Sequence, residues 1–246
     1  MKKMLFKEDL KNILENHKLW LESNKAGKRA DLSYTDLSKA DLANADLQYA
    51  NLAGANLYQA DLNHANLSNA DLTRANLIKA NLAYADLNHA NLSKVNFAYA
   101  DLNHANLVDA DLYSSNLKCV NLCHANLKFV DLSGIDLTYS NLDHADLSDV
   151  NLAGVDLHLT NLTHANLNST NLLHAKLPNR IIQIGPIGSY KSYTVINLDD
   201  DIIYCENWKG NTEEFKNRID EVYPDDGEYR TQYLSLLQLI ESLKAK

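Results

Sequence analysis

The sequence predicts an all-β solenoid, a four-sided β-helix over residues 30–177, with an α-helix before it and a small α/β segment after it. Two observations carry this prediction. An apolar residue recurs at every fifth position from Leu32 to Leu177, and it is Leu at all thirty positions except Phe97. Residues 20 apart also share the same steric limits, which indicates that four five-residue units complete one coil.

The five-residue unit reads Ala-Asp/Asn-Leu-x-x. Asp or Asn precedes the central apolar residue in 29 of the 30 units, and Ala stands two before it in 19 of them. A step of five residues turns an α-helix by about 140°, which would scatter the leucines around its axis. On a flat strand the leucines would alternate between faces. The chain must therefore bend once in each unit to keep every leucine inside.

The period of 20 is visible without the leucines. Four larger residues, Val95, Ser115, Ile135 and Val155, share one column of the coil. Another column holds only alanine, at Ala45, Ala65, Ala85, Ala105, Ala125, Ala145 and Ala165. Such differences are expected of four distinct corners. With coils ~4.8 Å apart, about 7.5 coils give a rod about 36 Å long.

These units resemble the pentapeptide-repeat family, and the resemblance covers about 148 residues. It implies a right-handed quadrilateral β-helix whose central Leu or Phe and small residue point inward, while the Asp or Asn and the last two residues point outward. The predicted structural core includes Leu32, Leu52, Leu72, Leu92, Phe97, Leu112, Leu132, Leu152, Leu172, Ala65, Ala105, Ala125 and Ala145. Burial of this many leucines is the main stabilising contribution.

An amphipathic helix is predicted over residues 5–23. Leu10, Ile13, Leu14, His17 and Leu21 recur at helical spacing, with Trp20 beside them. Because an open β-helix ends in unpaired backbone, we expect this helix to lie over the first coil as a cap. The chain then divides into residues 1–29, the repeat region 30–177 and an extension 178–246.

The extension reads as short strands followed by two helices. Strands are expected over 180–184, 192–198 and 202–205, with turns at Gly185-Pro186/Gly188, at 199–201 and up to Gly210. Asn211 and Glu214 form a capping box for a helix to about Tyr223. A second helix is expected from 229 or 230 to 243. This tail resembles the extension of other bacterial and phage members. It is read either as a cap or as a partner-binding or dimer-forming surface.

One outward column forms a candidate interaction face: His64, Tyr84, His104, His124, His144 and His164. Three interpretations are open: an exposed stack of rings, a shared metal, or a pH-sensitive stack. Side chains in a straight column do not converge on one point, whereas zinc needs three or four converging ligands, so no metal site is predicted. Abundant Asp makes any carboxylate pair uninformative, and no catalytic motif, catalytic residue or cofactor is predicted.

Composition narrows the function to surface recognition. The net charge of −9 argues against direct nucleic-acid or membrane binding, and no apolar run is long enough to span a bilayer. Three scattered cysteines suit a reducing cytoplasm. The leading hypothesis is a non-enzymatic interaction scaffold, monomer or homodimer, with an unknown protein partner. The alternatives are an acidic DNA mimic acting on gyrase, topoisomerase or another DNA-binding enzyme, as in some family members, and a structural or phage-linked role.

Overall fold

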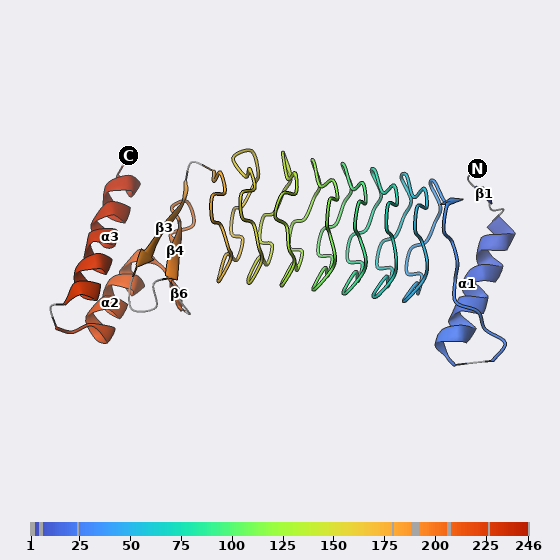
Figure 1. The fold of residues 1–246 in the computed structure, drawn as a ribbon, viewed down its shortest axis with the longest axis horizontal. Coiled ribbons are helices and arrows are strands. Elements are labelled where there is room, and N and C mark those ends of the chain that lie inside the picture. The colour runs from blue at the N-terminus through green and yellow to red at the C-terminus, as the bar shows by residue number, and fades with distance from the viewer. Residues whose placement is uncertain are drawn as a thin grey trace.

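The protein is a row of stacked coils with helix α1 at one end and an α/β module at the other (Figure 1). This computed structural model describes residues 3–4, 7–23, 25–178, 180–187, 192–205, 208–225 and 227–245. The module comprises strands β3–β6 and helices α2 and α3. None of the helices in the described ranges has the length and apolar character needed to span a membrane.

Residues 20 apart are neighbours on successive coils, as the 20-residue period predicts. We number the positions of a unit from its small residue, so that Ala60, Asp61, Leu62, Asn63 and His64 occupy positions one to five. Parallel bridges join second positions, for example Asp61 to Asn81. The Leu62 N–H donates to the Asn81 carbonyl at 2.7 Å, and the Asn81 N–H donates to the Ala60 carbonyl at 3.0 Å. These bonds satisfy backbone groups that would otherwise be buried without partners.

Each unit closes with a turn that explains its composition. The Ala65 N–H donates to the Leu62 carbonyl at 2.9 Å, and His64, the second of the two residues between them, has φ +55°. A positive φ at the third residue of a hydrogen-bonded turn is the pattern of a type II turn. Nearly every fifth position adopts it, although only Gly54, Gly134 and Gly154 are glycines. The turn sends the third position inward and the fifth outward.

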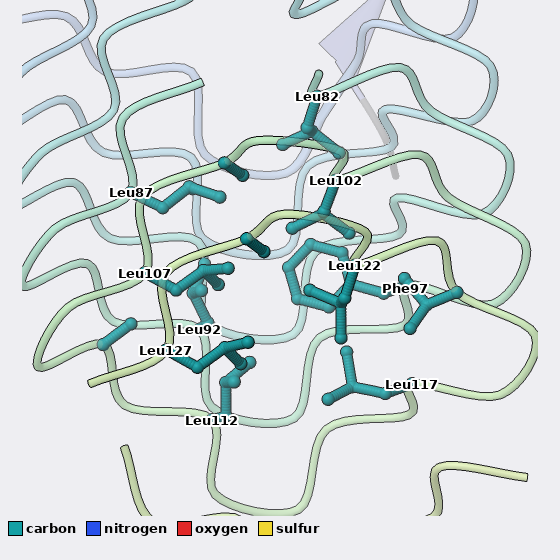
Figure 2. Packing of buried hydrophobic residues seen from close by; sticks show 14 of the residues in the cluster. Leu82, Leu87, Leu92, Phe97, Leu102, Leu107, Leu112, Leu117, Leu122 and Leu127 are labelled. Atoms are coloured by element: carbon teal, nitrogen blue, oxygen red, sulfur yellow. The ribbon is translucent and has the colours of Figure 1, made fainter. Parts of the chain in front are cut away.

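Third-position side chains from all four sides fill the interior (Figure 2). Leu82, Leu87, Leu92 and Phe97, which come from four consecutive sides, are each 0% exposed. Alanine at the first position leaves room for them at the corners, since Ala105 and Ala125 are also 0% exposed. The interior is therefore closely packed, and the outer faces are what other molecules can reach.

At the N-terminal end, β1 (Lys3–Met4) pairs in parallel with β2 (Thr35–Asp36), and α1 (Lys7–Leu21) lies against the first coil. Leu10, Ile13 and Leu14 pack on the core of the coils. The His17 ring is 0% exposed, and its Nδ1 accepts a hydrogen bond from the Ala30 N–H at 3.1 Å. The His17 side chain thus provides the acceptor for the backbone N–H of Ala30, which begins the first unit. Residues 5 and 6, where the helix is predicted to begin, lie outside the described residues.

At the C-terminal end, four antiparallel strands follow in the order β3 (Ile181–Ile187), β4 (Ser192–Asn197), β5 (Ile202–Cys205) and β6 (Trp208–Gly210). Helices α2 (Thr212–Val222) and α3 (Glu228–Lys244) complete the module. Alternate strand residues face opposite ways. Val195 and Tyr204 join the core of the coils, whereas Ile196 and Ile203 pack with Phe215 and other residues of the helices.

Side chains of the module take the place of the next coil's backbone. On most other coils the N–H of a fifth-position residue donates to a carbonyl of the following coil, as His144 does to Thr163 at 2.9 Å. At the last coil the His164 N–H donates instead to the Asp200 carboxylate at 2.6 Å. The Tyr204 hydroxyl likewise donates to the Ala165 carbonyl at 2.8 Å. The sheet is thereby joined to the coils without continuing their pattern.

Two predictions about the extension are wrong. Gly185 and Pro186 were expected in a turn but belong to β3, whose pairing with β4 shifts register between Ile184 and Ile187. A proline is tolerated there because β3 is an edge strand and the shift marks a bulge. The expected turn up to Gly210 is strand β6 instead. Gly188 lies outside the described residues. The predicted capping box of α2 is confirmed, with both Asn211–Glu214 bonds present.

Candidate interaction face

The rings of the predicted column form a continuous outward stack, which we call the ring ladder: His64, Tyr84, His104, His124, His144 and His164. Neighbouring ring centroids lie 4.8, 4.6, 4.5, 4.6 and 4.3 Å apart along the series. All six side chains are exposed. The spacing matches that of adjacent β-strands, so the rings stack because the backbone stacks.

The turn geometry explains why these side chains share one direction. Each ladder residue occupies the fifth position, with φ between +53° and +59°. Its N–H donates to a carbonyl of the next coil, as in the 2.9 Å bond from His104 to the Cys123 carbonyl, except in His164, whose N–H donates to Asp200. Because the backbone of each coil is held in this way, the rings are already in register before any ligand arrives.

The side of the coil that carries the ring ladder has no Lys or Arg. We call this side the ladder face; it consists of residues 40–44 and the blocks 20, 40, 60, 80, 100 and 120 residues later. Its charged residues are Asp41, Asp61, Asp101 and Asp143, whereas the seven Lys and Arg of 30–177 all stand on other sides. With neutral histidines the ladder face carries a charge of −4.

At the C-terminal end of the ring ladder, two carboxylates meet the last two rings. Asp143 Oδ1 lies 2.9 Å from His144 Nδ1 and 3.2 Å from His164 Nδ1. Asp200 Oδ1, from the turn between β4 and β5, lies 3.6 Å from His164 Nε2. Partial burial acts to raise the pKa of Asp143, but hydrogen bonds from His164 and His144 outweigh it and hold the pKa below its ordinary value.

The 20-residue period predicts the alignment of the histidines, but neither carboxylate was predicted beside them. Asp143 had a signal, because it is the one acidic residue in a column otherwise made of Ala43, Asn63, Ala83, Asn103, Cys123 and Thr163. Asp200 had none, because its place depends on how the module packs against the last coil. As for the residues named as core, the leucines and Phe97 are each 0–1% exposed, and the four alanines are also 0–1% exposed.

Comparison with known proteins gives the family. Eight copies of the family model described as pentapeptide repeats match the chain, over residues 28–63, 55–93, 90–128, 115–152, 131–168 and 145–179. The chain belongs to the pentapeptide-repeat family. Pentapeptide-repeat proteins form right-handed quadrilateral β-helices, which agrees with the four-unit coils seen here. A search of curated proteins finds no match.

Solved structures of other pentapeptide-repeat proteins, among them HetL and QnrB1, are similar to this chain. HetL, from the cyanobacterium Nostoc and described as involved in heterocyst differentiation regulation, is 33% identical, with 61% of this chain and 77% of HetL covered and a TM-score of 0.33. QnrB1 in a trypsin-treated form, a plasmid-mediated fluoroquinolone resistance protein, is 20% identical, with coverage of 59% and 82% and a TM-score of 0.47. The family assignment rests on the repeats themselves.

Proposed function

We propose that this pentapeptide-repeat protein is a non-enzymatic interaction scaffold whose ladder face binds a protein partner. The observation that carries the proposal is the ring ladder: six exposed rings in register, spaced 4.3–4.8 Å apart. The rings sit on a backbone that coil-to-coil hydrogen bonds already hold, so little conformational entropy is lost on binding. The leucine-filled interior leaves the outer surface to act.

The chemistry of the ladder face favours a partner that presents arginine. A guanidinium group stacks on aromatic faces and pairs with carboxylates, and both are offered side by side here. Tyr84 lies within the ladder, and Asp101 lies on the same side one coil further along. Because no Lys or Arg stands on this side, a basic partner meets no like charge there.

We assign residues 1–29 and 178–246 the role of covering the two ends of the coils. The repeat region between them, residues 30–177, then contains about 7.5 coils. Support comes from the bonds at the two ends: His17 receives the Ala30 N–H, and Asp200 and Tyr204 engage the last coil. Ends covered in this way resist edge-to-edge growth, which fits a monomer or homodimer. A reducing cytoplasm is the proposed location, since it suits the thiols of Cys119 and Cys123.

The proposal is tested with two matched double variants of the full-length protein. His104→Ser/His124→Ser removes the middle of the ring ladder, and Tyr99→Ser/Tyr139→Ser removes two exposed aromatic rings from another side. Serine already occupies the fifth position at Ser114 and Ser169, with φ +57° and +55°, so both variants keep the turn.

Immobilised wild-type and variant proteins are incubated with extract of the native host, and retained proteins are identified by mass spectrometry. The expected result is a partner held by the wild type and by the Tyr99/Tyr139 variant but lost by the His104/His124 variant. A partner held equally by all three proteins would place the binding surface elsewhere.

Acidic DNA mimicry is the second candidate, and the net negative charge of the repeat region permits it. Residues 30–177 carry 16 Asp, no Glu and seven Lys or Arg, for a net charge of −9. A DNA duplex about 36 Å long carries about −21, so the repeat region has less than half the charge density of DNA. A gyrase supercoiling assay decides: inhibition or protection from a quinolone supports mimicry, and no effect at high protein concentration removes gyrase as the target.

A further inference from the structure

The C-terminal end of the ring ladder brings three ligand-type side chains together on the surface. One oxygen of Asp143 lies 2.9 Å from Nδ1 of His144 and 3.2 Å from Nδ1 of His164, and the three donor atoms lie within 4.8 Å of one another. Donors bound to one tetrahedral ion by bonds of about 2.0–2.1 Å stand about 3.3 Å apart. The two separations that involve Asp143 Oδ1 are close to that value.

Here the rings also depart from simple stacking. His104 and His124 are almost parallel, with an interplanar angle of 4°. His144 is inclined by 37° to His124 and by 34° to His164. The change occurs on the coil where Asp143 stands beside the ladder. A stack alone would keep the rings parallel, whereas the inclined ring and its neighbour both direct Nδ1 at one carboxylate oxygen.

A second carboxylate, that of Asp200, lies against the other side of the His164 ring. Asp200 Oδ1 lies 3.6 Å from the other ring nitrogen of His164, and the Asp200 side chain is only 5% exposed. Its Oδ2 accepts hydrogen bonds from the His164 N–H and from Asn197 Nδ2, both at 2.6 Å. A histidine that binds a metal commonly directs its second ring nitrogen, as an N–H group, at a carboxylate. Asp200 therefore lies beside the ring nitrogen that carries the proton once a cation replaces the Nδ1 proton of His164.

We propose that Asp143, His144 and His164 bind one divalent transition-metal ion of the zinc class, through a carboxylate oxygen and the Nδ1 atom of each imidazole. Two neutral imidazoles and one carboxylate suit zinc, whereas magnesium and calcium prefer oxygen ligands alone. The His144 and His164 side chains are 44% and 52% exposed, so a further coordination position opens to solvent. It can be taken by water or by a donor from another molecule.

Bound metal would also strengthen the attachment of the module to the coils. His164 belongs to the last coil and Asp200 to the turn between β4 and β5, so an ion on His164 polarises the contact between them. Metal binding therefore stabilises the folded protein, and the apparent melting temperature rises with metal concentration. This inference is independent of which partner the ladder face binds.

The test is isothermal titration calorimetry of zinc chloride into full-length protein without an affinity tag. Asp143→Asn and His164→Asn each remove one proposed ligand. Both should fold, since Asn103 occupies the same column as Asp143, and Asn44 occupies the same column as His164 with φ +59°. His104→Asn is the matched control, because it removes a ladder histidine with no carboxylate beside it. Circular dichroism verifies the fold of each variant.

The expected result is one zinc ion per chain for the wild type and for His104→Asn, with affinity lowered at least tenfold in Asp143→Asn and His164→Asn. Zinc should raise the melting temperature of the first two proteins only, and magnesium should raise none. No zinc binding by the wild type would overturn the proposal. So would an equal loss in His104→Asn, which would assign binding to the ring ladder at large.

Discussion

The Asp or Asn at the second position of a unit can accept two hydrogen bonds with one oxygen, one within its unit and one from the next coil. Asp101 Oδ1 accepts the Asn103 N–H at 3.0 Å within its own unit and the Asn121 side-chain amide at 2.8 Å from the next coil. Only asparagine can supply that amide, since an ionised aspartate has no donor. This side-chain bond between coils can therefore form only where asparagine follows in the column, and two successive aspartates bring two carboxylates together without a donor.

Asp111 and Asp131 form such a pair. Within the described residues, backbone bridges are missing between Asp111 and Asp131 and between Asp136 and Asp156, although Asp41 and Asp61 keep theirs. We expect Asp111→Asn to stabilise the protein by about 0.5–1 kcal/mol, because it removes the like charge below Asp131 and adds an amide donor toward Asn91. Urea unfolding measures the change.

The reciprocal variant Asn121→Asp serves as the control. It removes the amide that Asp101 accepts and sets a second carboxylate above it, so it should destabilise by a similar amount. If both variants shift stability in the same direction, the amide-over-carboxylate account is wrong.

Alanine at the first position is a steric requirement. Ala125 is 0% exposed and closes a turn through the 3.0 Å bond from its N–H to the Leu122 carbonyl. A phenyl ring at this corner would have to displace packed leucines, so Ala125→Phe should lower stability by about 1–3 kcal/mol or more, or prevent folding. Thermal unfolding measures it, with Ala43→Phe on the outer surface as the control. An unchanged melting temperature would show that the corner has room.

At the scale of elements, the junction between the coils and the module depends on side chains. The Tyr204 hydroxyl donates to the carbonyl of Ala165, a residue that is 1% exposed. Burial is the main reason that the pKa of Tyr204 is raised, so the phenol keeps its proton. Tyr204→Phe keeps the ring and leaves a buried carbonyl without this donor, which should cost about 1–3 kcal/mol.

Chemical denaturation measures the effect, and Tyr229→Phe on α3 is the matched control. Tyr229 is 38% exposed, so loss of its hydroxyl should change stability by less than about 0.5 kcal/mol. Equal effects of the two variants would remove the special role of the Tyr204 contact.

The elements differ in how far the sequence could predict them. The coils were predictable from the five-residue repeat and the 20-residue spacing, because every unit has the same local pattern and its neighbour on the next coil always lies 20 residues away. Helix α2 was predictable because its capping box is local. Strand β6 and the course of β3 through Pro186 were not, because pairing with distant strands overrode local turn signals. The cluster of Asp143 and Asp200 around His164 depends on packing between segments 36 residues apart.

At the scale of the whole molecule, stability should fall with acidification in two stages. Burial is the largest cause that lowers the pKa of His17 below its ordinary 6.5, assisted by Arg29 and opposed by the Gln48 backbone and Asp46. The folded state therefore binds fewer protons at His17 than the unfolded chain. This stability is complete above pH 6.5 and declines as the pH falls toward the folded pKa.

The second stage comes from carboxylates. The Ser133 backbone N–H and hydroxyl, with the Asn151 amide, hold the pKa of Asp131 below its ordinary 3.8. Its contribution is present above pH 3.8 and is lost as the pH falls through the lower folded value. Melting temperatures measured from about pH 8 to pH 2 should show both declines. His17→Gln should lose the stage near pH 6.5 and keep the acidic one; an unchanged profile would exclude His17 as its source.

The 20-residue lag also determines how the molecule can change in length. Removing a whole coil shortens the protein and returns the C-terminal module to its original bearing about the long axis relative to α1. Removing a single unit turns the module by a quarter revolution and breaks the alignment of every column it crosses. Natural or engineered variants should therefore differ in length by steps of four units. A change of one unit would instead rotate the C-terminal module about the long axis relative to α1.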